Sequence, residues 1–356
     1  MKHSQILIID QVGTKAGMDI YNSALANQLL LEGKSVQLFS NFTNLAIFAK
    51  AVFSNKPLHI MGVFTYIKAW IFIYFYCIKL SSPAKVVIHY FKSNFIDYHF
   101  LNLLAKLSQV KIVLILHDAQ PLIGTSKDVI SQRYLNLVDV VLVHNKDLYN
   151  SIPGRHRDVR FVPHPVLNLG SIKNKYPTKL TKINLLFFGQ LKSSKGILEL
   201  LKLLSKSKHL GLFHLTIAGQ LRDLSKRSLN DMIRECKLEN SITLKIGYHT
   251  LEEQIKLFDE HDLIVLPYLE VYQSGVMIQA MSYGLPVLAT KLNYFVQEII
   301  HENTGWLYSQ NSVLEFDLII ATILKHPNLL PVVASQALTA VNLNHSIKSL
   351  TLALND

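Results

Sequence analysis

Short apolar runs alternate along the first half of the chain with segments whose apolar residues recur at helical spacing. The runs lie at residues 6–9, 36–39, 86–90, 112–116, 140–143 and 160–162. Helix-period segments, such as residues 20–31 and 95–107, lie between them. Continuous apolar strands separated by helices are typical of a parallel sheet that is covered on both faces. The pattern therefore predicts a Rossmann-like α/β domain over residues 1–165.

The alternation stops after Pro163-His164-Pro165 and resumes near residue 183. Residues 166–182 are polar, show no period and predict an inter-domain linker. Further apolar runs lie at residues 183–188, 212–218, 242–246, 263–266, 287–289 and 306–308. They predict a second Rossmann-like domain over residues 183–335, with ligands at the carboxyl ends of the strands. Residues 336–356 are expected to form a C-terminal helix, with packing back on the N-terminal domain as one arrangement.

The composition is that of a folded cytoplasmic protein. Hydrophobic residues make up 49% of the 356 residues and charged residues 17%, which excludes a disordered chain. Cys77 and Cys236 lie in unrelated segments without a neighbouring His cluster, so reduced thiols are expected rather than a disulfide or a metal site. The first apolar run is too short for a secretory signal and ends in Asp10, which favours a buried strand.

The positive charge is concentrated in the N-terminal half. The net charge is +11; residues 1–165 hold 17 Lys and Arg against 9 Asp and Glu, whereas residues 166–356 hold 19 against 16. A basic half suits a partner that carries phosphates, either nucleic acid or an anionic membrane surface. No RNP, helix-turn-helix or zinc-finger pattern is present in the sequence, so nucleic acid is not expected as a partner.

One apolar segment has two interpretations. Residues 69–78 are apolar and aromatic and lie between Lys68 and Lys79. The uninterrupted stretch is about half of the ~20 residues that a membrane span needs. It predicts either an interfacial helix, with Trp and Tyr at headgroup depth and lysines on anionic lipid, or a helix buried against the sheet. The sequence favours neither, so peripheral contact with the inner face of the cytoplasmic membrane stays open.

Two strand-to-helix turns carry candidate phosphate chemistry. In the first turn, Gly13 and Gly17 let the backbone approach a ligand, and the following helix start favours a diphosphate. The GxGxxG fingerprint is absent from this turn, which counts against an NAD enzyme. In the second turn, Lys192 and Lys195 follow the strand end at Gly189, which suits either a phosphate site or a solvated lysine loop.

Five motifs in residues 183–310 together carry a family resemblance. They are Gly189-Gln190-Leu191 through Lys195-Gly196, Ile217-Ala218-Gly219, Asp262 through Pro267, Glu270 through Gln279 with Gly284-Leu285-Pro286-Val287, and Glu298 with Thr304-Gly305. In this order and spacing the chain resembles the retaining GT-B glycosyltransferases of family 4, which build bacterial surface polysaccharides. The N-terminal half resembles them more loosely, through Ala16-Gly17 and Leu116-His117-Asp118.

The resemblance implies a fold and an activity. The fold would be GT-B: α/β, with two Rossmann-like domains whose parallel sheets face across a cleft. The activity would be retaining transfer of a hexosyl group from a nucleotide-diphosphate sugar to a glycan or lipid-linked glycan, in polysaccharide or lipopolysaccharide synthesis. The resemblance implies no cofactor besides this co-substrate and no metal. The sequence contains no DxD triplet, in agreement with metal independence.

The resemblance also implies three catalytic residues. Lys195 would neutralise the donor diphosphate as it becomes the leaving group. His117 would face the donor sugar and stabilise its oxocarbenium-like charge distribution, and Glu270 would lie beside the same sugar.

Further residues would bind the donor. The backbone at Gly17, and the loop formed by Gly189, Gln190 and Lys192, would contact the diphosphate. The N–H groups of Ser274, Gly275 and Val276 at a helix start would meet the phosphates. Gln279 would hold the ribose in place of the family's glutamate.

Departures from the family pattern keep two alternatives open. Gln190 stands where the family often has Arg, and Lys192 is the candidate replacement. Gln279 replaces a glutamate and binds hydroxyls as a neutral amide; it also follows Glu270 by nine positions rather than eight. A catalytically inactive GT-B partner subunit would explain the two glutamines. A GT-B nucleotide-sugar epimerase is the other alternative, and analysis of its products would identify it.

Overall fold

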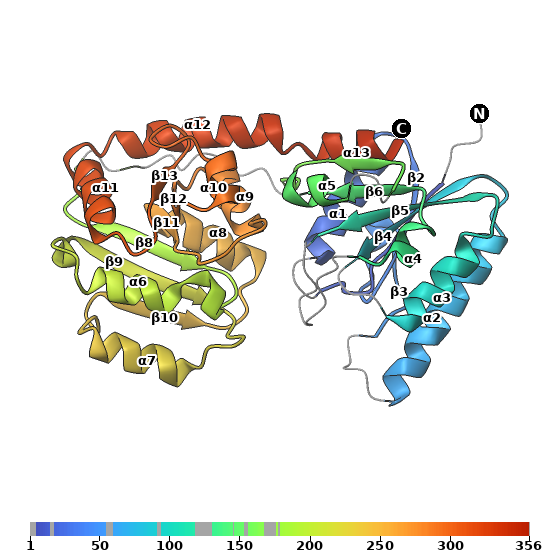
Figure 1. Ribbon diagram of the computed structural model, residues 1–356, viewed down its shortest axis with the longest axis horizontal. Helices are drawn as coiled ribbons and strands as arrows, with labels where there is room; N and C mark the ends of the chain where they lie inside the picture. Colours follow the sequence, from blue (N-terminus) through green and yellow to red (C-terminus); the bar gives the residue numbers. More distant parts are fainter. Residues whose placement is uncertain are drawn as a thin grey trace. The chain divides into compact units, whose positions relative to one another are not determined.

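The computed structural model of the chain describes residues 5–14, 18–54, 60–90, 94–117, 130–144, 146–152, 156–166, 176 and 179–355. The chain divides into two compact units. The first comprises Met1–Leu167 and Ser346–Asp356, and the second comprises Asn168–His345. Each unit contains one parallel sheet with helices packed on it (Figure 1). The predicted fold of two Rossmann-like α/β domains is therefore confirmed.

The sheet of the first unit has seven strands in the order β3-β2-β1-β4-β5-β6-β7, all parallel. The strands are β1 (Gln5–Ile9), β2 (Ser35–Ser40), β3 (Ala49–Ala51), β4 (Ala84–Tyr90), β5 (Val110–Leu116), β6 (Val140–Val143) and β7 (Val159–Phe161). The helices are α1 (Met18–Leu31), α2 (Ile60–Ile78), α3 (Phe95–Leu104), α4 (Gln132–Leu135), α5 (Lys146–Ser151) and α13 (Ile347–Asn355), with a 3-10 turn η1 (Leu45–Ile47).

Alternate residues along the strands of this sheet belong to two hydrophobic cores, one on each face. Leu7 and Ile9 pack with Trp70 of α2, whereas Ile6 and Ile8 pack with Leu25 of α1. Successive side chains of a strand point to opposite faces of the sheet. When helices cover both faces, every position of the strand is buried and favours an apolar residue. This explains why the first strand is a continuous apolar run.

The sheet of the second unit has six strands in the order β10-β9-β8-β11-β12-β13, also all parallel. The strands are β8 (Ile183–Phe188), β9 (Phe213–Gly219), β10 (Ile242–Ile246), β11 (Leu263–Leu266), β12 (Val287–Thr290) and β13 (Trp306–Tyr308). The helices are α6 (Ile197–Leu204), α7 (Lys226–Glu235), α8 (Leu251–Glu260), α9 (Gly275–Ser282), α10 (Asn293–Glu298), α11 (Val313–Lys325) and α12 (Leu329–Asn344), with 3-10 turns η2 (Ser193–Lys195) and η3 (Leu210–Leu212).

The chain passes between the units twice. The first passage is at Leu167–Asn168, within the predicted linker, most of which lies outside the described residues. The second is at His345–Ser346, between α12 and α13. The expected C-terminal segment 336–356 therefore contains two helices: the end of α12, which belongs to the second unit, and α13, which belongs to the first.

Helix α2 has a buried face and an exposed face. Ala69, Trp70, Ile73 and Cys77 are buried, and the Trp70 ring stacks on Phe100 with a centroid distance of 5.6 Å. The Trp70 indole N–H donates to Asp97 Oδ1 at 2.9 Å, and burial raises the pKa of this carboxyl to about 6. Of the two interpretations of this segment, headgroup depth does not hold for Trp70, because its apolar ring and its N–H both have partners inside the unit.

The opposite face of α2 is apolar and exposed. Its large side chains include Phe64, Ile71, Phe72, Phe75 and Ile78, with Phe64 61% and Phe75 55% exposed. Among the described residues, no single helix is long and apolar enough to cross a membrane; α11 and the α12–α13 segment pass that test only together, with a bend of 108° between them.

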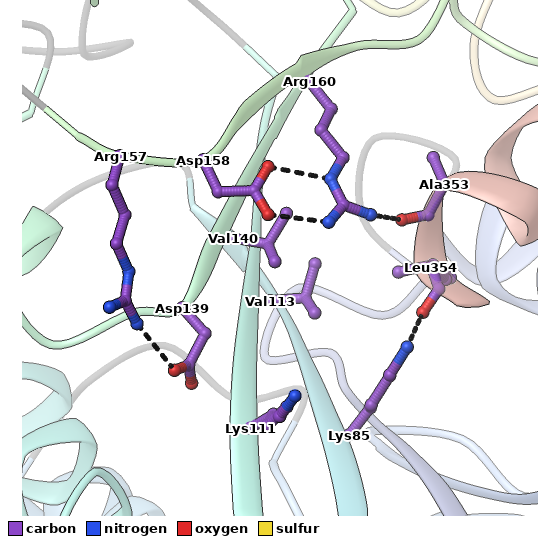
Figure 2. A pocket seen from close by; sticks show the side chains of 10 residues that line it. All are labelled: Lys85, Lys111, Val113, Asp139, Val140, Arg157, Asp158, Arg160, Ala353 and Leu354. Carbon is purple, nitrogen blue, oxygen red and sulfur yellow. Dashed lines mark hydrogen bonds and ion pairs between the residues drawn. The ribbon is translucent and has the colours of Figure 1, made fainter. Parts of the chain in front are cut away.

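A hollow of about 430 Å³ lies where β4, β5, β6 and β7 begin (Figure 2). Its charged lining includes Lys85, Lys111, Arg157 and Arg160, with Asp139 and Asp158 among them. Helix α13 closes one side through Ala353 and Leu354 (Figure 2). Since ligands of parallel sheets bind at the carboxyl ends of the strands, this hollow at the amino ends is interpreted as the docking site of α13.

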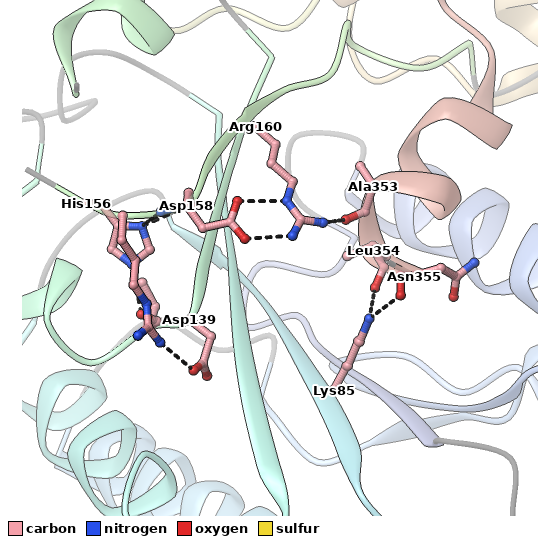
Figure 3. Close-up of polar contacts among 10 residues, drawn as sticks. Lys85, Asp139, His156, Asp158, Arg160, Ala353, Leu354 and Asn355 are labelled. Carbon is pink, nitrogen blue, oxygen red and sulfur yellow. Dashed lines mark hydrogen bonds and ion pairs between the residues drawn. The ribbon is translucent and has the colours of Figure 1, made fainter. Parts of the chain in front are cut away.

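Basic side chains cap the end of α13 (Figure 3). Arg160 donates to the Ala353 carbonyl at 2.7 Å while its other nitrogens bind Asp158 at 2.6 and 2.8 Å. Lys85 donates to the carbonyls of Leu354 and Asn355. The last carbonyls of a helix have no intrahelical donor and carry partial negative charge, so two cations stabilise this end and hold it on the sheet.

Replacement of Arg160 is expected to loosen α13. Arg160→Met removes the donor to Ala353 and the partner of Asp158, and should lower the free energy of unfolding by about 1–3 kcal/mol, since hydrogen bonds to charged groups fall in that range. Urea unfolding of the full chain measures the loss. Arg157→Met is the matched control, because Arg157 is 81% exposed and lies 3.6 Å from Asp139, and it should cost less than about 1 kcal/mol. Equal losses in the two variants would contradict the capping role.

Candidate active site

The carboxyl edge of the first sheet gathers polar side chains from five strands. Asp10 follows β1, His89 lies near the end of β4, His117 follows β5 and His144 follows β6. His164 lies just beyond β7. Because these strands are parallel neighbours, their ends meet at one edge, as predicted for the ligand side of the sheet.

Asp10 shapes the loop that follows β1. Its Oδ1 accepts from the N–H groups of Val12 at 3.0 Å and Gly13 at 2.7 Å, and its Oδ2 accepts from the Ser40 hydroxyl at 3.1 Å. Burial raises the pKa of Asp10, and these hydrogen bonds oppose the rise. Gly13 has φ +58°, and a side chain there would meet Asn41 Oδ1. Gly17, predicted to contact the diphosphate, lies outside the described residues.

Four imidazoles surround Tyr21 of α1 at this edge. The ring centroids of His89 and His117 lie 5.4 Å from that of Tyr21, and those of His144 and His164 lie 5.9 and 5.7 Å from it. Burial lowers the pKa of His117 well below its usual value, and neighbouring imidazoles lower it further. The His117 ring is therefore neutral. Among the described residues, these histidines form no arrangement that would hold a metal ion.

In the second unit, the loop after β8 meets the loop after β11. Lys195 Nζ lies 3.7 Å from the centroid of the Tyr268 ring, and Leu269 N–H donates to the Ser194 carbonyl at 3.0 Å. Gly196 has φ +67°, and a Cβ atom there would lie 1.9 Å from the Pro267 carbonyl oxygen. The two loops thus hold Lys195 over an aromatic face at the carboxyl edge, where a cation–π contact fixes the ammonium group.

Helix α9 begins at the same edge. Ser274 is its N-cap, and the Ser274 hydroxyl accepts from the Met277 N–H at 3.2 Å. The N–H groups of Gly275 and Val276 belong to the first turn, which lacks intrahelical acceptors. A Cβ atom on Gly189 would lie 3.3 Å from Val276, so the end of β8 faces the start of α9. Exposed amides at a helix start favour an anion.

The remaining predicted residues are either exposed or half-buried at the loops, or already hydrogen-bonded within the unit. Glu270 is exposed and makes no hydrogen bond or ion pair within residues 179–355, and Gln190 and Lys192 are half-buried in the loop after β8. Gln279 is already engaged: its amide N–H donates to Gln254 Oε1 of α8 at 3.1 Å, and Gln254 donates in turn to the His249 carbonyl at 3.1 Å. The structure thus places Lys195, Gly189 and Ser274–Val276 at the carboxyl edge of the second sheet, with Gly189 beside Val276, while His117 lies in the other unit.

Two family models match the chain. The family described as glycosyl transferases group 1 matches residues 170–337. The family described as glucosyltransferase 3-like, N-terminal domain, matches residues 86–162. An uncharacterized glycosyltransferase of Methanocaldococcus jannaschii is 26% identical over 130 residues, which are 36% of this chain and 32% of that protein. The chain thus spans about a third of that relative's length.

Solved structures share the whole architecture. Sucrose-phosphate synthase of Thermosynechococcus elongatus has a TM-score of 0.73 at 16% identity over 99% of this chain and 98% of that one. HepE of Anabaena in complex with UDP-glucose has a TM-score of 0.67 at 15% identity, over 99% of both chains. The lipopolysaccharide outer core galactosyltransferase WaaB, in its apo form, has a TM-score of 0.66 at 15% identity, over 99% of both chains.

The chain has the GT-B fold, and residues 170–337 match the model of the glycosyl transferases group 1 family. The likeness to solved structures shows the fold, and the match to the family model indicates a glycosyltransferase. The predicted loop with Lys195 and the predicted block from Glu270 to Pro286 both lie inside the matched residues.

Several residues at these two edges are not marked by the sequence motifs. Tyr268 and Gln254 stand outside any assigned role, and Asn22 and Tyr21 lie in an ordinary helix pattern. The signals that could have marked His89 and Asn22 are a polar side chain near a strand end, for His89, and a buried polar side chain early in the helix after the first strand, for Asn22.

The contact between the loops after β8 and β11 predicts how glycine variants behave. Gly196→Ala should destabilise the chain by more than about 1–2 kcal/mol, because the left-handed backbone cost adds to an overlap with the Pro267 carbonyl. Gly33→Ala is the matched control: it has φ +75° but nothing within 4 Å, so it carries the backbone cost alone. Chemical unfolding compares the two, and equal losses would show that the two loops are not in tight contact.

Proposed function

We propose that the chain is a retaining, metal-independent glycosyltransferase that moves a hexosyl group from a nucleotide-diphosphate sugar to a glycan or lipid-linked glycan. The observation that carries the proposal is the meeting of Lys195, Gly189 and the start of α9 at one sheet edge. A lysine, a glycine that admits close approach and unpaired helix amides are together suited to a diphosphate.

The proposed mechanism follows from where negative charge develops in the transition state. As the bond between the sugar and the β-phosphate breaks, negative charge accumulates on the diphosphate, and the Lys195 ammonium and the α9 amides stabilise it. These donors are held before the reaction: Lys195 rests on Tyr268, and α9 is capped by Ser274. The acceptor hydroxyl attacks from the face that the diphosphate leaves, and its proton passes to the departing phosphate oxygen. The sugar therefore keeps its anomeric configuration.

Two observations support the choice of substrates. HepE was solved with UDP-glucose and WaaB is a lipopolysaccharide outer core galactosyltransferase, so UDP-hexoses are the first donors to test and surface glycans the first acceptors. Gln279 would approach the ribose with its carbonyl, since its amide N–H is engaged by Gln254. A carbonyl accepts from ribose hydroxyls, as the glutamate of relatives would, without its charge.

The exposed face of α2 suits an anionic lipid surface. Phe64, Ile71 and Phe75 are exposed on this helix, which also carries the exposed Lys68 and is followed by the exposed Lys79. Lys50 Nζ lies 4.5 Å from the centroid of the Phe72 ring on this face, which adds a third cation. Apolar side chains that enter the headgroup region beside lysines bind anionic bilayers. We infer that α2 holds the enzyme peripherally on the inner face of the cytoplasmic membrane, near lipid-linked acceptors.

Turnover is expected to depend on Lys195. A thermal-shift screen of UDP-, GDP- and ADP-hexoses first identifies the donor, because a ligand of the folded state raises the melting temperature. Lys195→Met should then lower kcat for transfer by about 10²–10³-fold, the loss typical of one preorganised charge-stabilising donor.

The control is Lys202→Met, in the last turn of α6, which should leave kcat unchanged. Full activity of Lys195→Met would refute the site. Donor binding without transfer or hydrolysis by the unaltered chain, tested with several glycan acceptors, would instead favour the inactive partner subunit.

Membrane contact is expected to depend on the exposed face of α2. The chain should float with vesicles that contain phosphatidylglycerol and not with pure phosphatidylcholine, and high salt should reduce the bound fraction. Phe64→Ser with Phe75→Ser should weaken vesicle binding on the order of ten-fold. Leu314→Ser with Leu318→Ser on α11, where the two leucines are 79% and 66% exposed, is the matched control. Equal binding by the two double variants would refute α2 as the lipid contact.

A further inference from the structure

A line of buried side chains leads from the first turns of α1 to His117. Asn22 Oδ1 lies 2.7 Å from His89 Nε2, and His89 Nδ1 lies 2.7 Å from His117 Nε2. All three residues are buried, with Asn22 0%, His89 4% and His117 5% exposed. Each imidazole nitrogen in these contacts must be either a donor or an acceptor, so the first member of the line fixes all the others.

The orientation of the Asn22 amide follows from Asp10. The Asn22 side chain lies beside the Asp10 carboxyl and lowers its pKa, although its Nδ2 makes no hydrogen bond of normal geometry. Asp10 Oδ1 and Oδ2 already accept from Gly13 and Ser40, which is the pattern of an acceptor group. The amide N–H₂ therefore belongs on the side of Asp10, and the carbonyl Oδ1 belongs on the side of His89.

The orientation of the Asn22 amide determines which ring nitrogen of each histidine carries the proton. A carbonyl oxygen only accepts, so His89 carries its proton on Nε2. Burial and the nearby His144 lower the pKa of His89 to about 3, so its Nδ1 has a lone pair. His117 must donate to that lone pair, which places its proton on Nε2. Since His117 is neutral too, its Nδ1 carries the other lone pair.

The described groups that contact the pair favour the neutral state. Tyr21 contacts both rings edge-on, and burial raises the pKa of its phenol well above its usual value, so Tyr21 brings no negative charge. His144 Nδ1 lies 2.7 Å from the Val162 carbonyl and its Nε2 lies 2.9 Å from the Tyr21 hydroxyl. With the partly buried His164 beside it, an imidazolium here would face further imidazoles.

We propose that His89 and Asn22 are positioning residues that hold His117 neutral and in the Nε2–H tautomer, so that its Nδ1 carries a lone pair rather than a proton. The consequence rests on the proposed function. A lone pair suits a sugar hydroxyl or a ring that gains positive charge in the transition state, whereas an imidazolium would oppose that charge. A neutral His117 is thus suited to contact the sugar of the donor rather than its phosphates.

Histidine-selective ¹⁵N NMR of the full chain tests the proposal directly. Two-bond correlations between ring protons and nitrogens distinguish the two neutral tautomers and the cation, and His117→Gln assigns the signal. His117 should show the Nε2–H tautomer and stay neutral down to about pH 5, well below the ordinary histidine pKa of about 6.5. The exposed His99 provides the reference ring in contact with water. An Nδ1–H tautomer, or protonation of His117 near pH 6.5, would overturn the proposal.

A pair of variants separates positioning from packing. His89→Gln supplies an amide oxygen to accept from His117 and an amide N–H for Asn22, whereas His89→Leu supplies neither. The Leu variant should lose the Nε2–H signature of His117 and about 10–100-fold in kcat, the usual loss on removal of an orienting partner, with little change in donor KM. The Gln variant should retain the signature and most of the kcat. If both variants keep the signature, His89 does not set the tautomer.

The NMR experiment tests the tautomer assignment and the transfer assay tests the proposed function, so either claim can fail while the other holds. If the chain transfers no sugar and His117 shows the expected tautomer, the proposed function falls while the assignment of His89 and Asn22 stands. If transfer proceeds and His117 carries a proton on Nδ1, the assignment falls while the transferase stands.

Discussion

Parallel strand pairing is the constraint on which the rest of this structure depends. In each unit every strand runs the same way, so all carboxyl ends, and the starts of the helices that follow, meet at one edge. The edge of the second sheet therefore receives Lys195 from the loop after β8 and Ser274 from the loop after β11, although 79 positions separate them in the sequence. The same rule sets α13 apart, because Lys85 and Arg160 bind its carbonyls at the amino edge, away from the site residues.

The strands and the motif loops could be predicted from the sequence because their causes are local. Continuous apolar runs such as residues 6–9 are buried on both faces, which is typical of strands in a parallel sheet covered on both sides. The short edge strand β3 (Ala49–Ala51) was not predicted, since two of its residues are exposed and it is held by pairing with β2 and by a bridge to Asn44. Helix α2 was predicted as apolar, but its division into a buried Trp70 face and an exposed Phe64–Phe75 face depends on where the sheet lies.

The side-chain partners at the site could not be predicted, because they join segments that are distant in sequence. Gln279 was expected to approach a ribose through its amide, and its amide N–H is instead engaged by Gln254, 25 positions earlier. His89 and His117 are 28 positions apart and meet only because β4 and β5 are paired neighbours. A resemblance assigns a role to His117, but the proton that decides its chemistry is set by residues outside any motif.

The two sheet edges differ in charge in a way that matches the two halves of a sugar donor. At the edge of the second sheet, positive charge is concentrated: a lysine lies on an aromatic face and helix amides point outward, an environment in which a diphosphate is stabilised. At the edge of the first sheet, charge is removed: buried imidazoles hydrogen-bond to one another and stay neutral, although this unit holds most of the positive net charge of the chain. A cation among them would bind phosphate as well as the lysine does. Under the proposed function, neutral imidazoles leave phosphate binding to Lys195 and the α9 amides, whereas an uncharged ring with a lone pair suits a sugar hydroxyl.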